Sequence, residues 1–304
     1  MKRSSSWLLG VTLVVTPIVL AYAQGQAPAA PASPAPAAGQ APAAGQAPAA
    51  PTKAGRGRGP QTPPPPPLTC ASAATATDNK VPEALAKQGF TALFNGKDLT
   101  GWQALIDLEN NTLKGGAGLN PADLDKLTPA ERAAKQKFSN DRYLKHWSVV
   151  DGVLIFDGVQ PDKLTPRVEF GGQNLQYVTP FDDVEIYVDW CMHQGADSGV
   201  YLKNTPQIQM WFNPAGSGGL YNNEPRNNPL TVADNAADQW NTLRIIMQGD
   251  DMTTVWLNGK LVVDNVKYAN YWDRTKPLPA RGHFELQYHG DKLHWKNIYA
   301  KPLN

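Results

Sequence analysis

The chain has 304 residues, enough for one large domain or two small ones. Its 28 Lys and Arg and 27 Asp and Glu leave a net charge of +1. That balance argues against a nucleic-acid groove or an anionic-membrane footprint, since both need clustered basic residues.

The N-terminus has the pattern of a secretory signal peptide. Lys2 and Arg3 form a positive start, residues 7–20 are mainly apolar, and Ala21-Tyr22-Ala23 supplies small residues at the cleavage positions. The alternative is an uncleaved membrane anchor, but the apolar run is short for a bilayer span of about 20 residues. We therefore predict a cleaved signal peptide at residues 1–23, export to the periplasm or the extracellular space, and no membrane partner after cleavage.

The composition of residues 24–82 predicts a disordered, Pro/Ala-rich linker. The unit Gly-Gln-Ala-Pro-Ala-Ala recurs at Gly39 and Gly45, and residues 63–67 are all Pro. A segment with so few large apolar side chains cannot offset the entropy cost of ordering. The folded domain is expected to occupy residues 83–304.

The chain has only two cysteines. Cys70 lies in the predicted linker and Cys191 in a predicted strand. Export would permit a disulfide between them, but their different settings favour a free linker thiol and a buried, inert strand thiol. Two cysteines do not supply a Cys–His metal cluster.

The predicted elements are mostly short strands. One helix interrupts them: Thr128-Pro129-Ala130-Glu131 has the residues of a capping box with Pro at the first helical position, inside a helical insertion at about 120–145. Asp151-Gly152 and Asn258-Gly259 are two-residue hairpin turns. This pattern predicts an all-β sandwich or jelly roll. Strands are expected at 90–94, 147–150, 153–156, 184–192, 199–203, 208–212, 240–248, 253–257, 261–264, 284–289 and 293–300.

Strand alternation gathers polar side chains on one face of these strands. In the strand 284–289, Phe284, Leu286 and Tyr288 face the core. On this strand the polar face carries His283, Glu285, Gln287 and His289. On three other predicted strands the side chains that share a polar face are Gln207, Gln209 and Trp211; Asp197, Tyr201 and Lys203; and Glu185, Tyr187 and Asp189.

Two interpretations of this face remain open. An antiparallel sheet often turns one polar face to water. A solvent face, however, usually favours Thr, Lys, Glu and Ser, whereas amides and imidazoles beside flat rings suit polyhydroxyl ligands. We favour a ligand-binding face.

A series of motifs occurs in order along the chain: Phe94-Asn95-Gly96-Lys97-Asp98-Leu99-Thr100-Gly101-Trp102, Trp147-Ser148-Val149-Val150-Asp151-Gly152, Asp197-Ser198-Gly199-Val200-Tyr201-Leu202-Lys203, Gly218-Gly219-Leu220-Tyr221-Asn222-Asn223, Trp240-Asn241, Leu257-Asn258-Gly259-Lys260, Leu286-Gln287-Tyr288-His289-Gly290 and Trp295-Lys296-Asn297-Ile298-Tyr299. Together they resemble the 3-keto-disaccharide hydrolase domain over about residues 88–303. The resemblance implies a concanavalin-like β-sandwich, export, and cleavage of glycosides already oxidised at C3. One departure is Phe212, where the family pattern has Asp; alternation places Phe212 on the inward face.

The implied chemistry needs a general base, an enolate stabiliser and a sugar platform, and no cofactor. A C3 ketone acidifies the C2 proton; its removal gives an enolate, the C1 substituent leaves, and water adds. We assign His289 as the base, because an imidazole can take a proton near neutral pH. Glu285 is the alternate base or orients His289, and Lys203 stabilises the enolate. The predicted substrate contacts are Gln207, Gln209, Gln287, Trp211, Tyr201, Asp197 and Tyr221.

Three other functions are compatible with the same face. A non-catalytic glycan-binding module would use it without a base. A conventional glycosidase would need paired carboxylates, but Glu185 and Asp189 are four strand residues, roughly 13 Å, apart. A metal-dependent jelly roll could use His283, Glu285 and His289 to hold a divalent ion. The sequence does not fix the oligomeric state.

Overall fold

A computed structural model of the chain describes residues 69–106, 121–158, 174–204, 207–223, 228–271 and 273–303. All of them belong to one compact unit, Pro63–Asn304. The predicted signal peptide and the linker up to residue 68 lie outside the described residues. None of the helices in the described ranges is long and apolar enough to cross a membrane.

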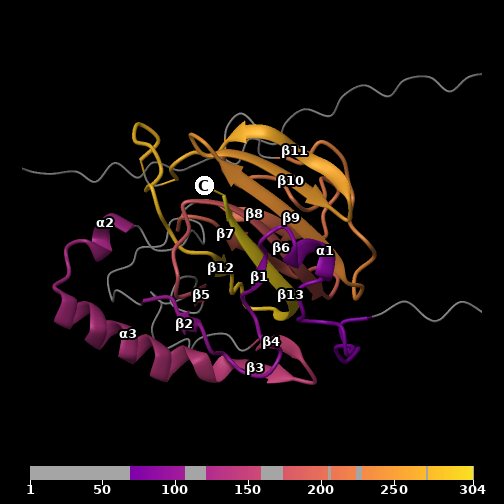
Figure 1. Ribbon diagram of the computed structural model, residues 1–304, viewed down its shortest axis with the longest axis horizontal. Coiled ribbons are helices and arrows are strands. Elements are labelled where there is room, and N and C mark those ends of the chain that lie inside the picture. Colours follow the sequence, from indigo (N-terminus) through magenta and orange to yellow (C-terminus); the bar gives the residue numbers. More distant parts are fainter. Residues whose placement is uncertain are drawn as a thin grey trace, which may run out of the picture. The chain divides into compact units, whose positions relative to one another are not determined.

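Two antiparallel sheets pack face to face, so the predicted all-β sandwich is confirmed (Figure 1). The larger sheet has the order β11-β10-β9-β6-β13-β4-β3, with β1 on β13; the smaller has the order β2-β5-β12-β7-β8. The strands of the larger sheet are β1 Thr91–Ala92, β3 Trp147–Val150, β4 Val153–Asp157, β6 Asp183–Met192, β9 Asn241–Gln248, β10 Met252–Leu257, β11 Lys260–Lys267 and β13 Lys292–Leu303; those of the smaller are β2 Trp102–Ala104, β5 Leu175–Tyr177, β7 Asp197–Tyr201, β8 Gln207–Trp211 and β12 Glu285–Leu286.

The core between the sheets follows from the alternation in the sequence. Ile186, Val188 and Trp190 on β6 are fully buried. In the opposite sheet, Leu286 on β12 and Phe284 just before it are buried as well. Large apolar side chains that leave water on both inner faces supply the main stabilisation of a sandwich. The opposite faces of both sheets are therefore free to carry polar residues.

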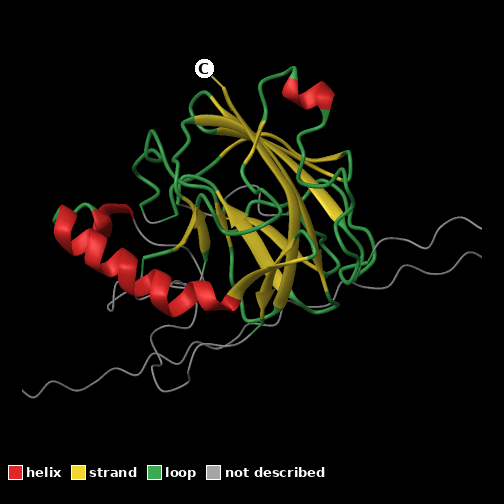
Figure 2. Cartoon of the chain, turned by 60° about the horizontal axis from the view of Figure 1, so that its bottom comes forward, coloured by secondary structure: helices red, strands yellow, loops and turns green. Residues whose placement is uncertain are grey.

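Four helical segments lie beside the sheets: α1 Glu83–Ala86, α2 Pro121–Leu124, α3 Pro129–Tyr143 and the short 3-10 helix η1 Leu144–His146. The predicted capping box is present, because Thr128 and Glu131 exchange hydrogen bonds at the start of α3. Helix α3 packs against β2 at the edge of the smaller sheet (Figures 1 and 2). Asn140 accepts from the backbone N–H of Ala104 and Gln136 donates to its carbonyl, so the helix covers an exposed strand edge.

Residues 69–82, assigned to the linker from composition, lie against the larger sheet. Cys70 and Cys191 form a disulfide with a Cα–Cα distance of 5.4 Å, so the preference for two free thiols is wrong. The segment is held farther along by Lys296, whose Nζ lies 2.9 Å from the Asp78 carboxylate. Polar and small residues can be ordered by a covalent bond and ion pairs even where they carry no hydrophobic core, and composition alone does not register those bonds.

Both predicted hairpins are confirmed. Asp151-Gly152 joins β3 to β4 and Asn258-Gly259 joins β10 to β11, and all four residues have positive φ angles. Strand β5 was not predicted. The strand expected at 284–289 pairs only at Glu285–Leu286.

Candidate functional site

A row of five polar side chains crosses the outer face of the smaller sheet, one from each strand. The pairing register places Gln103, Gln176, Glu285, Tyr201 and Gln207 directly opposite one another on β2, β5, β12, β7 and β8. Four of the five are buried, and Gln103 is half-buried. Polar side chains that are both aligned and shielded from bulk water differ from an ordinary solvent face, where they would be exposed.

Glu285, at the centre of the row, is completely buried and is held by amides. Its carboxylate accepts hydrogen bonds from Gln176 at 3.0 Å, Asn204 at 2.7 Å and Asn174 at 3.1 Å. Burial raises the pKa of Glu285, and the amide hydrogen bonds and the nearby His283 oppose that rise only in part. No described cationic Lys or Arg side chain forms an ion pair with it. The result is a desolvated carboxylate, a setting that favours proton transfer.

The two asparagines are fixed by the backbone on either side of Glu285. Asn204 accepts from the N–H of His283 and Asn174 accepts from the N–H of Tyr288, through their amide oxygens. Each therefore presents its NH₂ group to the carboxylate. The site is built so that both flanking amides can only donate to Glu285.

Tyr201 stands opposite Glu285 on β7 and keeps its hydroxyl proton. Its ring is buried, and its hydroxyl accepts a hydrogen bond of 3.0 Å from Gln287. Burial, followed by the negative charge of Glu285, raises the pKa of Tyr201 well above its ordinary value. A neutral phenol beside a carboxylate provides a hydrogen-bond donor for a developing oxyanion.

A second chain of amides ends at Asp197. Gln207 donates to Gln209, and Gln209 donates to the Asp197 carboxylate at 2.6 Å. Burial raises the pKa of Asp197, and the nearby His289 lowers it in part. His289 is half-buried, so this histidine belongs to the Asp197 end of the face rather than to the amide cluster around Glu285.

Lys203 has a different setting from the one expected. Its Nζ lies 2.7 Å from Asp251 in the turn before β10, and 3.9 Å from Asp182. Lys203 and Asn204 both have positive φ angles, and an added Cβ at Gly282 would come within 2.3 Å of the Lys203 Cα. Because of this tight turn, the Lys203 side chain points to Asp251 and forms an ion pair with it. The side chain of the next residue, Asn204, points to the carboxylate of Glu285.

The remaining predicted contacts lie toward β8. Trp211 is half-buried opposite Asp197, and its indole N–H donates to the Gly216 carbonyl at 2.8 Å, which fixes the ring. Tyr221 is half-buried in the loop that follows. Phe212 packs against Trp190 with ring centroids 6.0 Å apart, so its predicted inward orientation is confirmed.

The sequence also allowed a carboxylate pair at Glu185 and Asp189 or a metal site at His283, Glu285 and His289. Glu185 and Asp189 lie on the outer face of the other sheet, where Arg244 and Lys301 pair with Glu185. Within the described ranges, no group of three or more His, Cys, Asp or Glu is placed to hold a metal ion. The Nδ1 of His283 lies 2.8 Å from the Tyr177 carbonyl oxygen.

A comparison with protein families identifies the family of this chain. Residues 89–301 match the model of the 3-keto-alpha-glucoside-1,2-lyase-like domain, which is more than half of the chain. The chain belongs to this family. The resemblance to this family is thereby confirmed, and the family supports an enzyme that acts on carbohydrate.

Several solved structures are similar to this chain. A candidate glycosyl hydrolase from Parabacteroides distasonis is 20% identical, with a TM-score of 0.50, over 75% of this chain and 100% of that one. A second such protein from the same organism is 20% identical over 71% and 84% of the two chains, with a TM-score of 0.44. A β-glucanase from Bacillus licheniformis is 12% identical over 71% and 97%, with a TM-score of 0.41. None of the curated proteins matches this chain.

Sequence reasoning missed three of the groups around Glu285. Asn174 lies just before the unpredicted strand β5, Gln176 lies within it, and Asn204 lies in the turn after β7. A weak signal was present: Asn174-Leu175-Gln176-Tyr177 alternates polar and apolar residues. Three residues are too short a strand to stand out without its neighbours.

Proposed function

We propose that the domain cleaves glycosides oxidised at C3 and that Glu285 is the base that removes the C2 proton. The observation that carries this proposal is the burial of Glu285 among amides, without a cationic partner in the described part of the chain. A carboxylate paired with Lys or Arg would be a weaker base, because the cation stabilises its charged form. Amide donors hold the group in place while its pKa stays raised.

The reaction balances with the groups of this face. Glu285 takes the proton from C2, and the electrons of that C–H bond form an enolate with the C3 oxygen. Tyr201 donates its hydroxyl hydrogen to the enolate oxygen as a hydrogen bond. The enolate then expels the C1 oxygen, which takes the proton held by Glu285 and leaves as the alcohol. Water adds across the resulting C1–C2 double bond, with its OH at C1 and its hydrogen at C2, to give the 3-keto sugar.

The sugar would lie along the remaining amides. Gln207, Gln209 and Gln287 both donate and accept hydrogen bonds, as hydroxyl groups require, and Trp211 offers a fixed aromatic face. His289 remains the alternate base, beside Asp197. A lectin-like module that uses the same contacts without turnover is the second candidate.

The test is an assay of the mature chain on nitrophenyl 3-keto-glucosides and on the matching unoxidised glucosides. We expect aglycone release only from the oxidised set, with kcat/KM rising with pH through a pKa above that of an ordinary Glu. In heavy water, NMR should show deuterium at C2 of the product. Equal cleavage of both sets would overturn the proposal, and binding without release would identify the lectin-like alternative.

The assignment of the base has its own readout. His289→Ala should retain deuterium incorporation at C2, whereas Glu285→Gln should lose it. The reverse result would assign the base to His289.

We also propose that the protein works outside the cytoplasm. The disulfide between Cys70 and Cys191 supports this, because structural disulfides persist in oxidising compartments. N-terminal sequencing of the protein isolated from its host should begin at Gln24; a sequence that begins at Met1 would contradict the proposal.

A further inference from the structure

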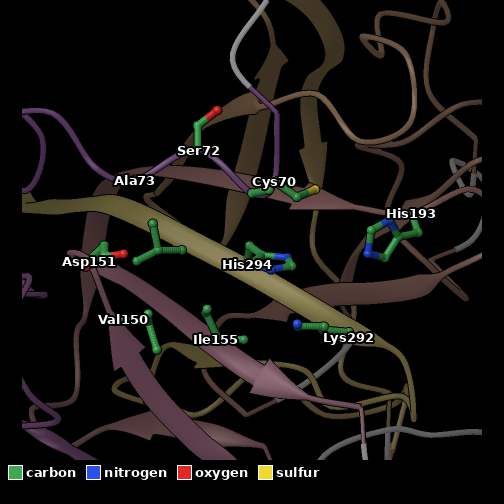
Figure 3. A pocket seen from close by; sticks show the side chains of 11 residues that line it. Cys70, Ser72, Ala73, Val150, Asp151, Ile155, His193, Lys292 and His294 are labelled. Carbon is green, nitrogen blue, oxygen red and sulfur yellow. The ribbon is translucent and has the colours of Figure 1, made fainter.

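A pocket of about 250 Å³ lies on the opposite side of the sandwich from Glu285, on the outer face of the larger sheet. The segment Cys70–Ala73 forms one wall, and β3, β4 and β13 form the floor (Figure 3). The volume is below the roughly 300–1,000 Å³ of pockets for drug-sized ligands. It suits an occupant the size of a single sugar ring.

His294 supplies a buried hydrogen-bond acceptor at the centre of this pocket. The residue is 5% exposed. Its Nδ1 has no hydrogen-bond partner in the described residues, and a neutral imidazole can present a lone pair there to accept a hydrogen bond. A buried polar atom without a partner costs free energy, and a ligand that donates a proton to it would remove that cost.

The two ends of the pocket differ in hydrogen-bonding character. Figure 3 shows Lys292 and His193 toward one end and Asp151 at the other, with Val150 and Ile155 along the floor. No described residue forms an ion pair with Lys292. The lining therefore offers a donor at one end, acceptors at the centre and the far end, and an apolar surface between them.

We propose that this pocket is a second, non-catalytic binding site for one neutral sugar ring. A ring hydroxyl donates to Nδ1 of His294, another accepts from Lys292, and the apolar C–H face lies over Val150 and Ile155. Only groups that both donate and accept satisfy this mixed lining. This proposal does not depend on the proposed function, because the pocket lies on the larger sheet and Glu285 lies on the smaller one.

A charged occupant fits the lining less well. A carboxylate has no proton to give to Nδ1 of His294 and would face its lone pair. Burial, with help from Lys292 and His193, lowers the pKa of His294 to about 4, so the ring is neutral at pH 7 and adds no positive charge. The carboxylate of Asp238 already pairs with His193, and Asp151 adds further negative charge.

The test uses methyl α-D-glucopyranoside, which is not oxidised at C3, with the mature full-length chain and saturation-transfer NMR. We expect a dissociation constant on the order of millimolar, typical of so small a ligand. His294→Phe and Lys292→Met should each weaken binding about tenfold, as the loss of one hydrogen bond predicts. Lys292 is exposed, so Lys292→Met keeps the test valid if the His294 variant fails to fold.

Two matched variants separate this site from the other face. Lys260→Met removes an exposed lysine of β11 and should leave binding unchanged. Tyr201→Phe alters the opposite sheet and should also leave it unchanged. No binding of the glucoside, binding lost only in the Tyr201 variant, or tighter binding of glucuronate that depends on Lys292 would each overturn the proposal.

Discussion

Two buried glutamates, one on the outer face of each sheet, have opposite kinds of hydrogen-bond partner. On the larger sheet Glu185, 4% exposed, lies 2.7 Å from Arg244 and 2.8 Å from Lys301. On the smaller sheet Glu285 is 0% exposed and accepts only from neutral amides among the described residues. The two glutamates are thus almost equally buried, but Glu185 is paired with cations and Glu285 with neutral amides.

A second pair of carboxylates repeats the contrast. Burial raises the pKa of Asp78, but hydrogen bonds from Lys296, the Thr75 backbone and Asn297 outweigh it, so the pKa is lowered. Asp197, held by Gln209, has a raised pKa because burial dominates. A cation stabilises the charged form far more than an amide does.

The difference agrees with the proposed roles of the two faces, structural for the larger sheet and reactive for the smaller one. Cations pair with Asp78 and Glu185, which tie residues 69–82 and β6 to β13, and these groups contribute stability. The amides around Glu285 position a carboxylate without neutralising it, at a cost in stability that a functional group can justify.

We expect the largest effect from Glu285→Gln, which removes one of the two glutamates compared above. Glu285→Gln keeps the shape of the side chain but removes the base, so kcat/KM on a 3-keto-glucoside should fall by about 10²–10⁴. The variant no longer buries a charge, but its NH₂ group must face an amide donor such as that of Asn174, so its free energy of unfolding should change by no more than about 1 kcal/mol. Enzyme kinetics and urea unfolding measure the two quantities.

Glu185→Gln is the matched control on the other face. It leaves Arg244 and Lys301 without their carboxylate, so we expect a loss of about 1–2 kcal/mol in unfolding free energy, with activity retained. The contrast between the faces fails if both Gln variants lose stability alike or both keep activity.

The second effect concerns the bond that fixes residues 69–82 to the larger sheet. The disulfide joins residues 121 positions apart. Its removal in the Cys70→Ala, Cys191→Ala double variant should lower the unfolding free energy by about 2–4 kcal/mol. Activity of the folded variant should persist, because Glu285 lies on the other sheet.

Reductant supplies the control for this prediction. It should destabilise the natural chain by a similar amount and leave the double variant unaffected. An unchanged urea midpoint in the natural chain after full reduction would contradict a stabilising role.

Sequence reasoning predicted what depends on local sequence patterns. The capping box at Thr128 and the two Gly hairpins follow from short motifs, and the face that carries Glu285 and Gln287 follows from the two-residue period of a strand. The disulfide could not be derived in this way, because its partners meet only after β6 and residues 69–82 are placed in three dimensions.

The roles within the site were harder to predict than its location. Alternation placed Lys203 beside Tyr201, but β7 ends at Tyr201 and the left-handed turn that follows redirects Lys203 to Asp251. Asn204 takes the place beside Glu285 for the same reason. Strand periodicity stops at the strand end, and the backbone angles of a turn decide where the next side chains go.

We expect the smallest effect in the pH dependence of the unfolding free energy, to which the two sheets contribute with opposite sign. Burial lowers the pKa of His294 to about 4 from 6.5, so between those values the unfolded chain binds a proton that the folded chain does not. Stability therefore falls as the pH falls through that window, by roughly 1–3 kcal/mol from this residue. Glu285 acts in the opposite direction: its pKa is raised above 4.5, so the folded chain takes up its proton first and gains stability on acidification.

Urea unfolding at pH 7, 5.5 and 4.5 should separate these two contributions. His294→Gln should lose less stability than the natural chain as the pH falls, and Glu285→Gln should lose more. Equal slopes in all three proteins would mean that neither group changes its proton affinity on folding. Opposite shifts in the two variants would show that acid destabilises the fold through His294 on the larger sheet and stabilises it through Glu285 on the smaller one.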